Sequence, residues 1–362
     1  MVTYSPFEEP VEPPKVQDFI LINSPPQTVE LPFKPVPLVR CLDILHESAG
    51  VDLSVGVEMN MAQIILSDMV QCMQSNVTHE LLETKEVLLS AKLARGKQVD
   101  FFENYTCADN DMPTTAAIRQ ESWYNPKEDR TFEVAILHER PASRVHALEN
   151  FITPEECKAM EDAAQPLLHK ASVADGKGGS TYSPNRKAMQ AGIKVPWEKE
   201  AEGDLIATLS RRVYDYTNHV LDLDLKENGQ EDLMSIQYFG RGKNDTEPDR
   251  YMPHCDGDCD GRAHMFGNRM ATMVLYCTIP EIGGATNFRN AGIHIKPKVG
   301  SGTFFSYIDP ETMRMDLGFT EHSGCPVIQG EKKIVTQWIR LGVDDENPWD
   351  SFNTREFLND FV

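Results

Sequence analysis

The sequence predicts an α+β protein with a double-stranded β-helix, or jelly roll, as its core, preceded by supporting helices and by an additional helical N-terminal region. Three observations lead to this prediction. Apolar residues recur at helical spacing before about residue 230, the period falls to two residues beyond it, and glycine and proline divide the later part into short runs. Short strands without intervening helices are typical of a sandwich or barrel, and a jelly roll presents side chains from several strands at one mouth.

The composition favours a soluble globular chain with an acidic surface. Of the 362 residues, 40% are hydrophobic, which is enough to close a core. The 56 acidic residues outnumber the 35 basic residues and give a formal net charge of -21, which repels phosphate backbones and anionic lipid. We therefore expect no nucleic-acid partner, and no apolar run is long enough to span a membrane. The acidity is consistent with solubility alone or with attraction to a basic substrate, and the oligomeric state stays open.

The chain divides into four parts. Residues 1–40 carry a proline every few positions, which prevents helix formation, so we expect an extended arm. Residues 41–130 form a helical N-terminal region of unknown role, because apolar side chains, many of them methionine, recur at three- and four-residue steps between residues 57 and 93. We expect these methionines to pack in a core or against a partner. Residues 131–345 form the main domain, and residues 346–362 form a tail.

The main domain begins with a strand and two helices. Alternation predicts the first strand at Phe132–Leu137. Thr153, Pro154 and Glu156 have the spacing of a capping box and predict that a helix begins there. A second helix is expected over Leu205–Val220. The later strands are expected at Leu233–Phe239, Ala271–Ile279, Ile293–Lys296, Gly302–Ile308, Met315–Glu321 and Ile334–Leu341.

The eight cysteines show neither a CxxC pair nor the density of a disulfide scaffold, so we expect mostly buried free thiols. A cross-link between Cys255 and Cys259 remains open. Glycosylation sequons at Asn76, Asn104 and Asn244 argue against a cytosolic chain, but three sequons are close to what chance gives in a chain of this length. The residues alone leave the compartment open.

The only His-x-Asp motif of the chain is His254-Cys255-Asp256, and His322 follows downstream at the start of the run HSGCPVIQGEKKIVTQWIR. Alternation in a strand places His254 and Asp256 on one face. Two histidines and one carboxylate leave three metal positions open, as in non-heme Fe(II) oxygenases, where a 2-oxo acid takes two positions and O₂ takes the third. These residues therefore predict an iron-dependent oxygenase.

The distal carboxylate of a 2-oxo acid requires a buried cation. Lys332 lies at the head of the last predicted strand and is placed to supply it. A buried ammonium is costly unless it is paired, so an inward lysine indicates an anion in the pocket. Because Lys332 and Lys333 alternate in direction, one of them is expected to be an ordinary surface residue.

The run NRMATMVLYCTIPEIGGATNF, residues 268–288, lies between the His-x-Asp motif and the run that begins at His322. Together these motifs resemble the catalytic domain of the prolyl 4-hydroxylase alpha-subunit family over about residues 145–342. The resemblance implies an Fe(II)- and 2-oxoglutarate-dependent dioxygenase that hydroxylates proline in a peptide or protein, consumes O₂, releases succinate and CO₂, and uses ascorbate to rescue oxidised iron. It also implies the endoplasmic reticulum lumen, with the cytoplasm as the alternative.

The resemblance assigns three groups of side chains, those that bind iron, those that bind 2-oxoglutarate and those beside the peptide. The implied iron ligands are His254, Asp256 and His322, the implied 2-oxoglutarate contacts are Lys332, Tyr238 and Thr286, and the implied peptide contacts are Arg269 and Trp338.

The chain departs from the family pattern in several places. The family usually has Lys-Trp where this chain has Lys332-Lys333, which removes an aromatic side chain from the site. The segment Arg241–Pro253 is longer and more charged than usual, and we expect a loop at the mouth of the site. Ala174–Gly192 falls where the family has a lid over the peptide, although a solvent loop is equally consistent. Trp338 is equally consistent with strand packing.

Two other metal sites fit parts of the same region. The run DGDCDG, residues 256–261, matches the first half of an EF-hand loop, but Gly267 stands where calcium requires a glutamate. A zinc site is the second alternative, although its spacing is not that of a standard finger. Its ligands would be His254, Cys255, Cys259 and His264.

Two alternative functions also remain. A catalytically lapsed jelly roll could act as a binding module through its N-terminal region, although the complete ligand set favours an enzyme. The same chemistry could instead act on another side chain or on a small metabolite, which the ligand set does not exclude.

Overall fold

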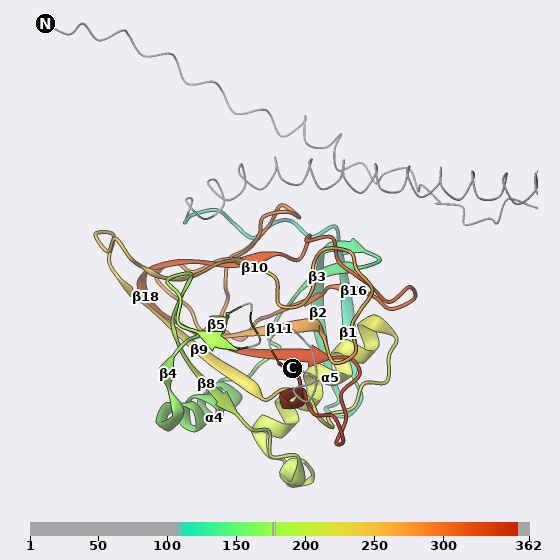
Figure 1. Cartoon of the computed structure of the whole chain (residues 1–362). Helices are drawn as coiled ribbons and strands as arrows, with labels where there is room; N and C mark the ends of the chain where they lie inside the picture. The colour runs from blue at the N-terminus through green and yellow to red at the C-terminus, as the bar shows by residue number, and fades with distance from the viewer. Residues whose placement is uncertain (1–106, 108–109, 176, 178, 354–362) are drawn as a thin grey trace, which may run out of the picture. The chain divides into compact units, whose positions relative to one another are not determined.

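The structure is a computed structural model that describes residues 107, 110–175, 177 and 179–353, and in this part strands predominate (Figure 1). The predicted arm at 1–40 and the predicted helical segment at 57–93 lie outside the described residues. The described helices are α4 (Pro154–Ala164), α5 (Leu205–Leu221) and the short 3₁₀ turns η1 (Gln165–Leu167), η2 (Trp197–Glu202) and η3 (Trp349–Ser351). The described strands are β1 (Arg119–Asn125), β2 (Arg130–Arg140), β3 (Ser143–Leu148), β4 (His169–Lys170), β5 (Val173–Ala174), β6 (Ser180–Thr181), β7 (Arg186–Lys187), β8 (Met189–Ile193), β9 (Leu233–Arg241), β10 (Asp249–His254), β11 (Arg269–Thr278), β12 (Ile282–Gly283), β13 (Thr286–Phe288), β14 (Ile293–Ile295), β15 (Gly302–Ser306), β16 (Ile308–Asp309), β17 (Arg314–Met315) and β18 (His322–Arg340).

The main sheet has 14 strands, and β18 joins its two parts. One part follows the order β1-β2-β3-β15-β11-β18-β9-β8-β4. The first half of β18 also pairs with β10, β12 and β13, while its second half pairs with β9 and β11. All of these pairings are antiparallel. This antiparallel arrangement, in which one strand belongs to both parts, confirms the predicted jelly-roll core.

The two α-helices cover one side of the larger part of the sheet, away from β10 (Figure 1). The capping box predicted at Thr153 and Glu156 is present at the start of α4. Glu156 also forms a buried ion pair with Arg212 of α5, with 2.6 Å between Arg212 Nη2 and Glu156 Oε1. The Arg212 guanidinium donates in addition to the carbonyl of Phe151. A local cap and a buried ion pair therefore fix the two helices against each other.

The sheet begins earlier than the predicted boundary at residue 131. β1 pairs along its whole length with β2, and Trp123 of β1 stacks on Phe132 with 5.3 Å between ring centroids. Only the end of β1 is buried, so its sequence shows little of the alternation that marks a strand. At the other end, Phe352 in the predicted tail is buried and packs against Gly267.

The predicted strand at residues 315–321 is wrong. Only Arg314–Met315 is a strand, and Asp316 holds the following turn by accepting hydrogen bonds from the backbone and the side chain of Thr320. The predicted strand at residues 334–341 is instead the second half of β18, which begins at His322.

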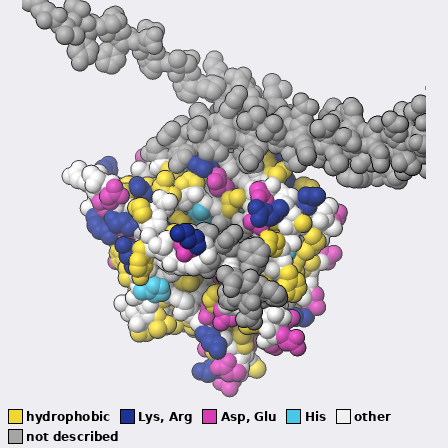
Figure 2. All heavy atoms as spheres, viewed as in Figure 1, with side chains coloured by type: hydrophobic (Ala, Val, Ile, Leu, Met, Phe, Trp, Pro, Cys, Tyr) yellow, Lys and Arg dark blue, Asp and Glu magenta, His cyan; other side chains and the backbone are white. Residues whose placement is uncertain are grey.

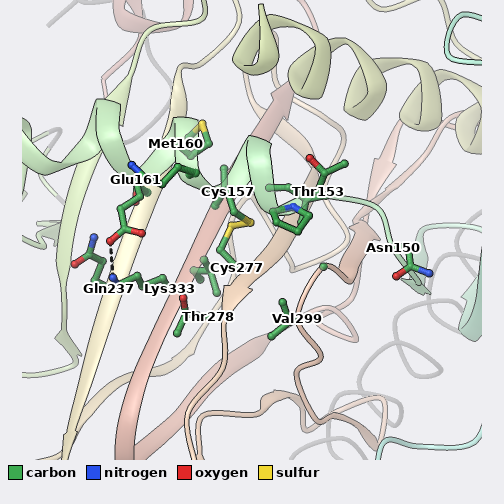
Figure 3. A pocket seen from close by; sticks show the side chains of 17 residues that line it. Asn150, Thr153, Cys157, Met160, Glu161, Gln237, Cys277, Thr278, Val299 and Lys333 are labelled. Carbon is green, nitrogen blue, oxygen red and sulfur yellow. Dashed lines mark hydrogen bonds and ion pairs between the residues drawn. A yellow bond between two sulfur atoms is a disulfide. The ribbon is translucent and has the colours of Figure 1, made fainter.

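The expectation of mostly free thiols is wrong, because all six cysteines that the structure describes are paired, and the Cys255–Cys259 cross-link that was left open is present. The pairs are Cys107–Cys325, Cys157–Cys277 and Cys255–Cys259. The first two join segments 218 and 120 residues apart, and sequence spacing does not reveal such pairings. Figure 3 shows the bridge from Cys157 on α4 to Cys277 on β11, which lines a pocket between the helix and the sheet.

Charged side chains of both signs are spread among hydrophobic ones over the face in Figure 2. On that face the acidic excess therefore does not form one continuous patch. Within the described part of the chain, no helix has the length and hydrophobicity needed to cross a membrane.

Candidate functional site

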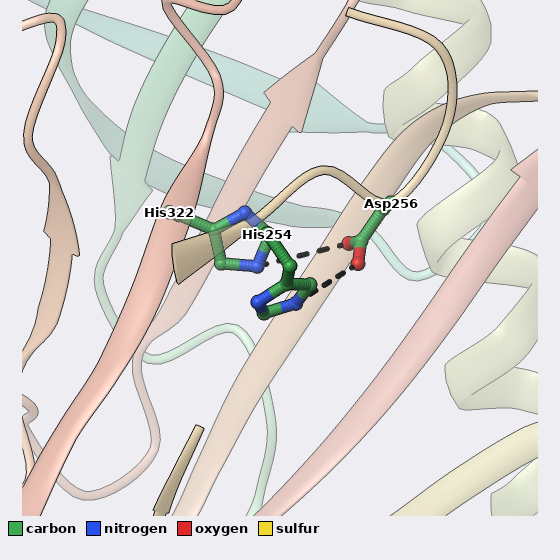
Figure 4. Close-up of side chains that lie close together, drawn as sticks. All are labelled: His254, Asp256 and His322. Carbon is green, nitrogen blue, oxygen red and sulfur yellow. Dashed lines mark ion pairs between the residues drawn. The ribbon is translucent and has the colours of Figure 1, made fainter. Parts of the chain in front are cut away.

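Three side chains that are far apart in the sequence meet where β10 ends and β18 begins. His254 is the last residue of β10, His322 is the first residue of β18, and the two are paired across the sheet. The carboxylate oxygens of Asp256 lie 3.4 Å from His254 Nε2 and 3.9 Å from His322 Nε2. The atoms of the three side chains that could bind a metal lie within 4.8 Å of one another (Figure 4).

Strand alternation does not explain this arrangement, although we expected it to. β10 ends at His254, so Asp256 lies on the loop beyond the strand. The loop turns the carboxylate back toward the two imidazoles, and Thr272 of β11 fixes it by donating from Oγ1 to Asp256 Oδ2 at 2.8 Å.

Backbone carbonyls orient both imidazole rings. His254 Nδ1 donates to the carbonyl of Met252 at 2.8 Å, and His322 Nδ1 donates to that of Thr320 at 3.1 Å. Because a carbonyl oxygen only accepts, Nδ1 carries a proton in each ring, and in the neutral form of the ring Nε2 then keeps its lone pair. Both Nε2 atoms face the carboxylate, so two neutral nitrogens and one anionic oxygen converge.

The charge states of the cluster favour metal binding. Burial lowers the pKa of His322 to about 4, and repulsion from His254 acts in the same direction. Burial opposes the charge on Asp256, but His322, His254 and Arg269 together hold the pKa of that carboxyl below its usual range. A neutral His322 imidazole beside an ionised Asp256 carboxylate is the combination that binds a metal cation.

The donor set of two histidines and one carboxylate fits Fe(II), and the two alternative sites are less complete. Among residues 107–353, as far as they are described, these three side chains form the one group of histidine, cysteine and acidic residues close enough to hold a metal. Cys255 and Cys259 are joined in a disulfide, which removes both thiolates from the zinc alternative. In the EF-hand alternative, the carboxylate of Asp260 already forms an ion pair with Arg262, which competes with a cation for it.

A buried lysine shares a cavity with the three side chains that could bind a metal. Lys332 is 2% exposed and forms no hydrogen bond or ion pair with the described residues. Its Nζ lies 5.6 Å from the ring centroid of Tyr238 and 5.7 Å from that of Tyr276. Burial alone lowers the pKa of Lys332 to about 7. An ammonium in this position has no counter-ion and is therefore available to an anion.

Two hydroxyl groups lie beside this lysine. Tyr238 is the cross-strand partner of Lys332, and burial raises the pKa of its phenol to about 12, so it stays protonated. Thr286 lines the same cavity, with its Oγ1 2.8 Å from the hydroxyl of Tyr276. The cavity thus combines the Lys332 ammonium with the hydroxyl groups of Tyr238 and Thr286.

Lys333 is the lysine that faces away from the cavity. Its Nζ lies 2.6 Å from Glu161 of α4, on the outer side of the sheet (Figure 3). As predicted from alternation, one of the two adjacent lysines is therefore an ordinary partly exposed residue.

A wider groove opens from this cavity to the surface. Its volume is about 640 Å³, and Asp256, Tyr251, Arg186 and Trp338 line both spaces. The turn η3, near the C-terminus, also lines the groove. It gives an extended ligand access to the metal-binding side chains.

Arg269 and Trp338 form one unit in the wall of this groove. The guanidinium carbon of Arg269 lies 4.0 Å from the ring centroid of Trp338. Glu231 holds Arg269 through two hydrogen bonds of 2.5 and 2.6 Å, and it also pairs with Arg340 at 2.6 Å. Trp338 is 7% exposed, and its Nε1 has no hydrogen-bond partner among the described residues. That indole N–H is thus a buried donor at the edge of the groove.

Arg186 and Tyr251 belong to the site but were not predicted. The ring of Tyr251 stacks on that of His254, with 3.5 Å between centroids, and the Arg186 guanidinium lies 4.8 Å from the Tyr251 centroid. Arg186 donates from Nη1 to the carbonyl of Ser172, while its buried Nε and Nη2 find no partner in the part of the chain that the structure describes. In the sequence, the signal that could have identified Arg186 was its positive charge within the expected lid.

The two segments expected at the mouth of the site are more ordered than predicted. The second half of the expected loop Arg241–Pro253 is strand β10, anchored by buried Asp249, which pairs with Arg241 at 2.8 Å. Of the described residues in the expected lid Ala174–Gly192, only those of β5 and β6 pair with each other apart from the main sheet. β7 and β8 pair with β10 and β9, so their backbone groups are held in the sheet.

Comparisons with known proteins agree with this geometry. Residues 237–340 match the sequence model of the 2OG-Fe(II) oxygenase superfamily. Probable prolyl 4-hydroxylase 3 of Arabidopsis thaliana is 26% identical over 219 residues, which are 55% of this chain and 70% of the relative. Prolyl 4-hydroxylase subunit alpha-2 of Caenorhabditis elegans is 30% identical over 52% of this chain and 33% of its own length. Subunit alpha-3 of Mus musculus is 28% identical over 56% of this chain and 34% of its own length.

The chain therefore spans only about a third of the animal subunits that it matches. Among solved structures, the 2OG complex of a viral collagen prolyl hydroxylase from Paramecium Bursaria Chlorella virus-1 is 28% identical, with a TM-score of 0.42. That match covers 54% of this chain and 96% of the viral one.

Proposed function

Because the chain belongs to the 2OG-Fe(II) oxygenase superfamily, we propose that it is a peptidyl-prolyl 4-hydroxylase that uses Fe(II), 2-oxoglutarate and O₂. One observation carries the proposal: His254, Asp256 and His322 converge in a cavity that also contains an unpaired buried lysine. The relatives with this chemistry are prolyl 4-hydroxylases, and the substrate class is taken from them.

In the proposed site, His254, Asp256 and His322 hold the iron, and Lys332 binds the distal carboxylate of 2-oxoglutarate. The hydroxyls of Tyr238 and Thr286 support the same carboxylate. Bound iron and 2-oxoglutarate supply the oxidation, in which O₂ is consumed, 2-oxoglutarate is converted to succinate and CO₂, and one oxygen atom enters the substrate. The chain contributes position and a cavity that excludes most water.

The pKa of Lys332 leads to a testable pH dependence. Burial lowers this pKa to about 7, so at about pH 8 the ligand-free lysine is mostly neutral. A bound carboxylate favours the ammonium and raises its pKa, so binding of 2-oxoglutarate takes up a proton and weakens as the pH rises above about 7. Calorimetry in two buffers of different ionisation enthalpy measures this uptake. Equal binding enthalpies in both buffers would contradict the assignment of Lys332.

The peptide is proposed to lie in the groove, beside Arg269, Trp338 and Arg186. Buried donors without partners, Trp338 Nε1 and Arg186 Nε and Nη2, suit the carbonyl groups of an extended peptide. An extended proline-containing chain offers such carbonyls at regular intervals. Its proline nitrogens carry no N–H and therefore need no acceptor in the groove.

Replacing Trp338 with phenylalanine tests the peptide site. The change keeps an aromatic ring beside Arg269 but removes the indole N–H, so we expect the KM for peptide to rise about fivefold, the effect of one hydrogen bond. The KM for 2-oxoglutarate should stay the same, because Lys332 is untouched. Steady-state kinetics with each substrate varied in turn separates the two constants. An unchanged KM for peptide would leave Trp338 as a packing residue only.

The central experiment incubates the purified full chain with Fe(II), 2-oxoglutarate and a panel of proline-containing peptides. Mass spectrometry should detect a single added oxygen on proline, with succinate formed in step. Matched peptides with alanine in place of proline, and reactions without 2-oxoglutarate, serve as controls. Succinate formation without oxygen on any peptide would instead support the alternative of another side chain or a small metabolite. Failure to bind 2-oxoglutarate in a metal-dependent way would support a lapsed binding module.

We also propose an oxidising compartment such as the endoplasmic reticulum lumen, with ascorbate as the reductant for oxidised iron. The three disulfides support the compartment, and Asn244 of the third sequon is exposed. The proposal that ascorbate is the reductant rests on the family resemblance. Thiol labelling of protein extracted under acid quench tests the compartment, because a cytosolic chain would show all eight cysteines reduced.

A further inference from the structure

One disulfide lies within the metal-binding motif itself. Cys255 stands between His254 and Asp256 in the sequence, and its bridge to Cys259 closes a loop with a sequence separation of only 4. That loop contains Asp256, one of the three side chains that converge at the candidate metal site. The bridge therefore constrains the backbone on both sides of this carboxylate.

The sheet does not hold this loop. β10 ends at His254, and between residues 255 and 260 no backbone group is hydrogen-bonded to another backbone group of the described chain. Side chains provide further restraints. Thr272 donates to Asp256, Asn268 Nδ2 donates to Asp258 at 3.1 Å, and Arg269 Nη1 donates to the carbonyl of Asp256 at 3.5 Å. The disulfide is the one covalent restraint on the position of Asp256 relative to the rest of its loop.

The loop also fits closely against its surroundings. A Cβ atom at Gly257 would lie 2.6 Å from Tyr307 Cε2 and 2.7 Å from the carbonyl oxygen of Arg269. Residue 257 must therefore stay at this close approach for Asp256 to face the two imidazoles, and a loosened loop moves the carboxylate out of place.

The bridge is accessible to a reductant. Cys255 and Cys259 are both half-buried, and Cys255 lines the wide groove together with Gly257 and Asp258. Cys325 in the Cys107 bridge is buried at 4% exposure, whereas Cys157 and Cys277 are half-buried and line a separate pocket away from the metal-binding motif. A dithiol that enters the groove therefore meets Cys255 of the bridge in the groove wall.

We propose that the Cys255–Cys259 bridge is a site of thiol–disulfide exchange that sets the affinity of the metal site. A thiolate of a dithiol attacks one sulfur, the S–S bond breaks, and the second thiol of the reductant releases the mixed disulfide. Two electrons and two protons pass to Cys255 and Cys259, and the dithiol becomes a disulfide. The oxidised loop holds Asp256 for the metal, and the reduced loop holds it less well. The inference rests on the proposed function only in requiring that the three side chains bind a divalent metal.

The test measures Co(II) binding by anaerobic calorimetry, since this ion stays divalent and requires no turnover. We expect the double variant Cys255→Ser/Cys259→Ser to bind Co(II) about tenfold more weakly than the oxidised wild-type chain, the lower end of the effect of outer-shell changes on metal affinity. The matched control is Cys157→Ser/Cys277→Ser, which removes a bridge between α4 and β11 and should change the affinity less than twofold. Circular dichroism checks that each variant is folded.

A second measurement uses the wild-type chain, so that it does not depend on the folding of a variant. A limiting amount of dithiothreitol, followed by iodoacetamide, should label Cys255 and Cys259, and the labelled fraction should show the same tenfold loss of Co(II) affinity. Equal Co(II) affinity of the oxidised chain and the double variant, or no labelling of this pair, would overturn the proposal while leaving the proposed function intact. A wild-type chain that binds no Co(II) would overturn both.

Discussion

The His322→Ala protein is expected to lose at least about a thousandfold in hydroxylation rate. The substitution removes one of three converging metal-binding side chains, and a loss of about 4 kcal/mol in transition-state stabilisation corresponds to that factor. Asp256→Ala should have an effect of the same size. Both rates are measured by oxygen added to peptide, and metal binding is measured in parallel with Co(II).

The control for this prediction is His169→Ala, which removes an exposed imidazole far from the three ligands in the sequence. It should keep the wild-type rate. Normal activity in His322→Ala would refute the assignment of this histidine as an iron ligand, and so would unchanged Co(II) affinity.

The Lys332→Met protein is expected to need about a hundredfold more 2-oxoglutarate for half-maximal rate. The substitution keeps the volume of the side chain but removes the buried cation that is proposed to pair with the distal carboxylate, a loss of about 3 kcal/mol for a hydrogen bond to a charged group. The maximal rate should change much less, because this carboxylate is remote from the reacting bond. The KM and kcat for 2-oxoglutarate, measured at saturating peptide, separate the two effects.

The adjacent Lys333 provides a matched control with the same side chain. Because its ammonium pairs with Glu161 on the outer side of the sheet, Lys333→Met should leave the KM for 2-oxoglutarate within about twofold of wild type. A further contrast concerns stability without ligand. Lys332→Met removes an unpaired buried ammonium and should stabilise the ligand-free protein, most at low pH where the lysine is charged. Equal KM values in the two variants would exclude Lys332 as the carboxylate partner.

Local signals in the sequence predicted local structure well. The capping box at Thr153 specifies the start of α4 because its hydrogen bonds lie within three residues. The direction of Lys332 relative to Lys333 followed from alternation, since both lie in the regular second half of β18. The convergence of His254 with His322 was inferred from a resemblance carried by several motifs, and the structure brings the two rings within 4.3 Å between centroids.

Features that depend on tertiary pairing were not predictable. No spacing rule joins Cys107 to Cys325 or Cys157 to Cys277, so the cysteines were taken for free thiols. β1 was missed because only Trp123 and Asn125 are buried in it, which leaves too short a pattern. Arg186 was missed as a site residue for a similar reason, since its place beside Tyr251 follows from the pairing of β7 with β10.

The bond between Cys107 and Cys325 turns most of the described chain into a closed covalent ring. Cys325 lies three residues after His322 in β18, so the segment that leads into the domain is fastened next to a candidate iron ligand. If a protease cuts the chain once anywhere between the two cysteines, the two fragments remain joined through sulfur. Nicked protein should therefore migrate as one species on a non-reducing gel, separate only after reductant is added, and keep its N-terminal part attached to the strand that begins with His322.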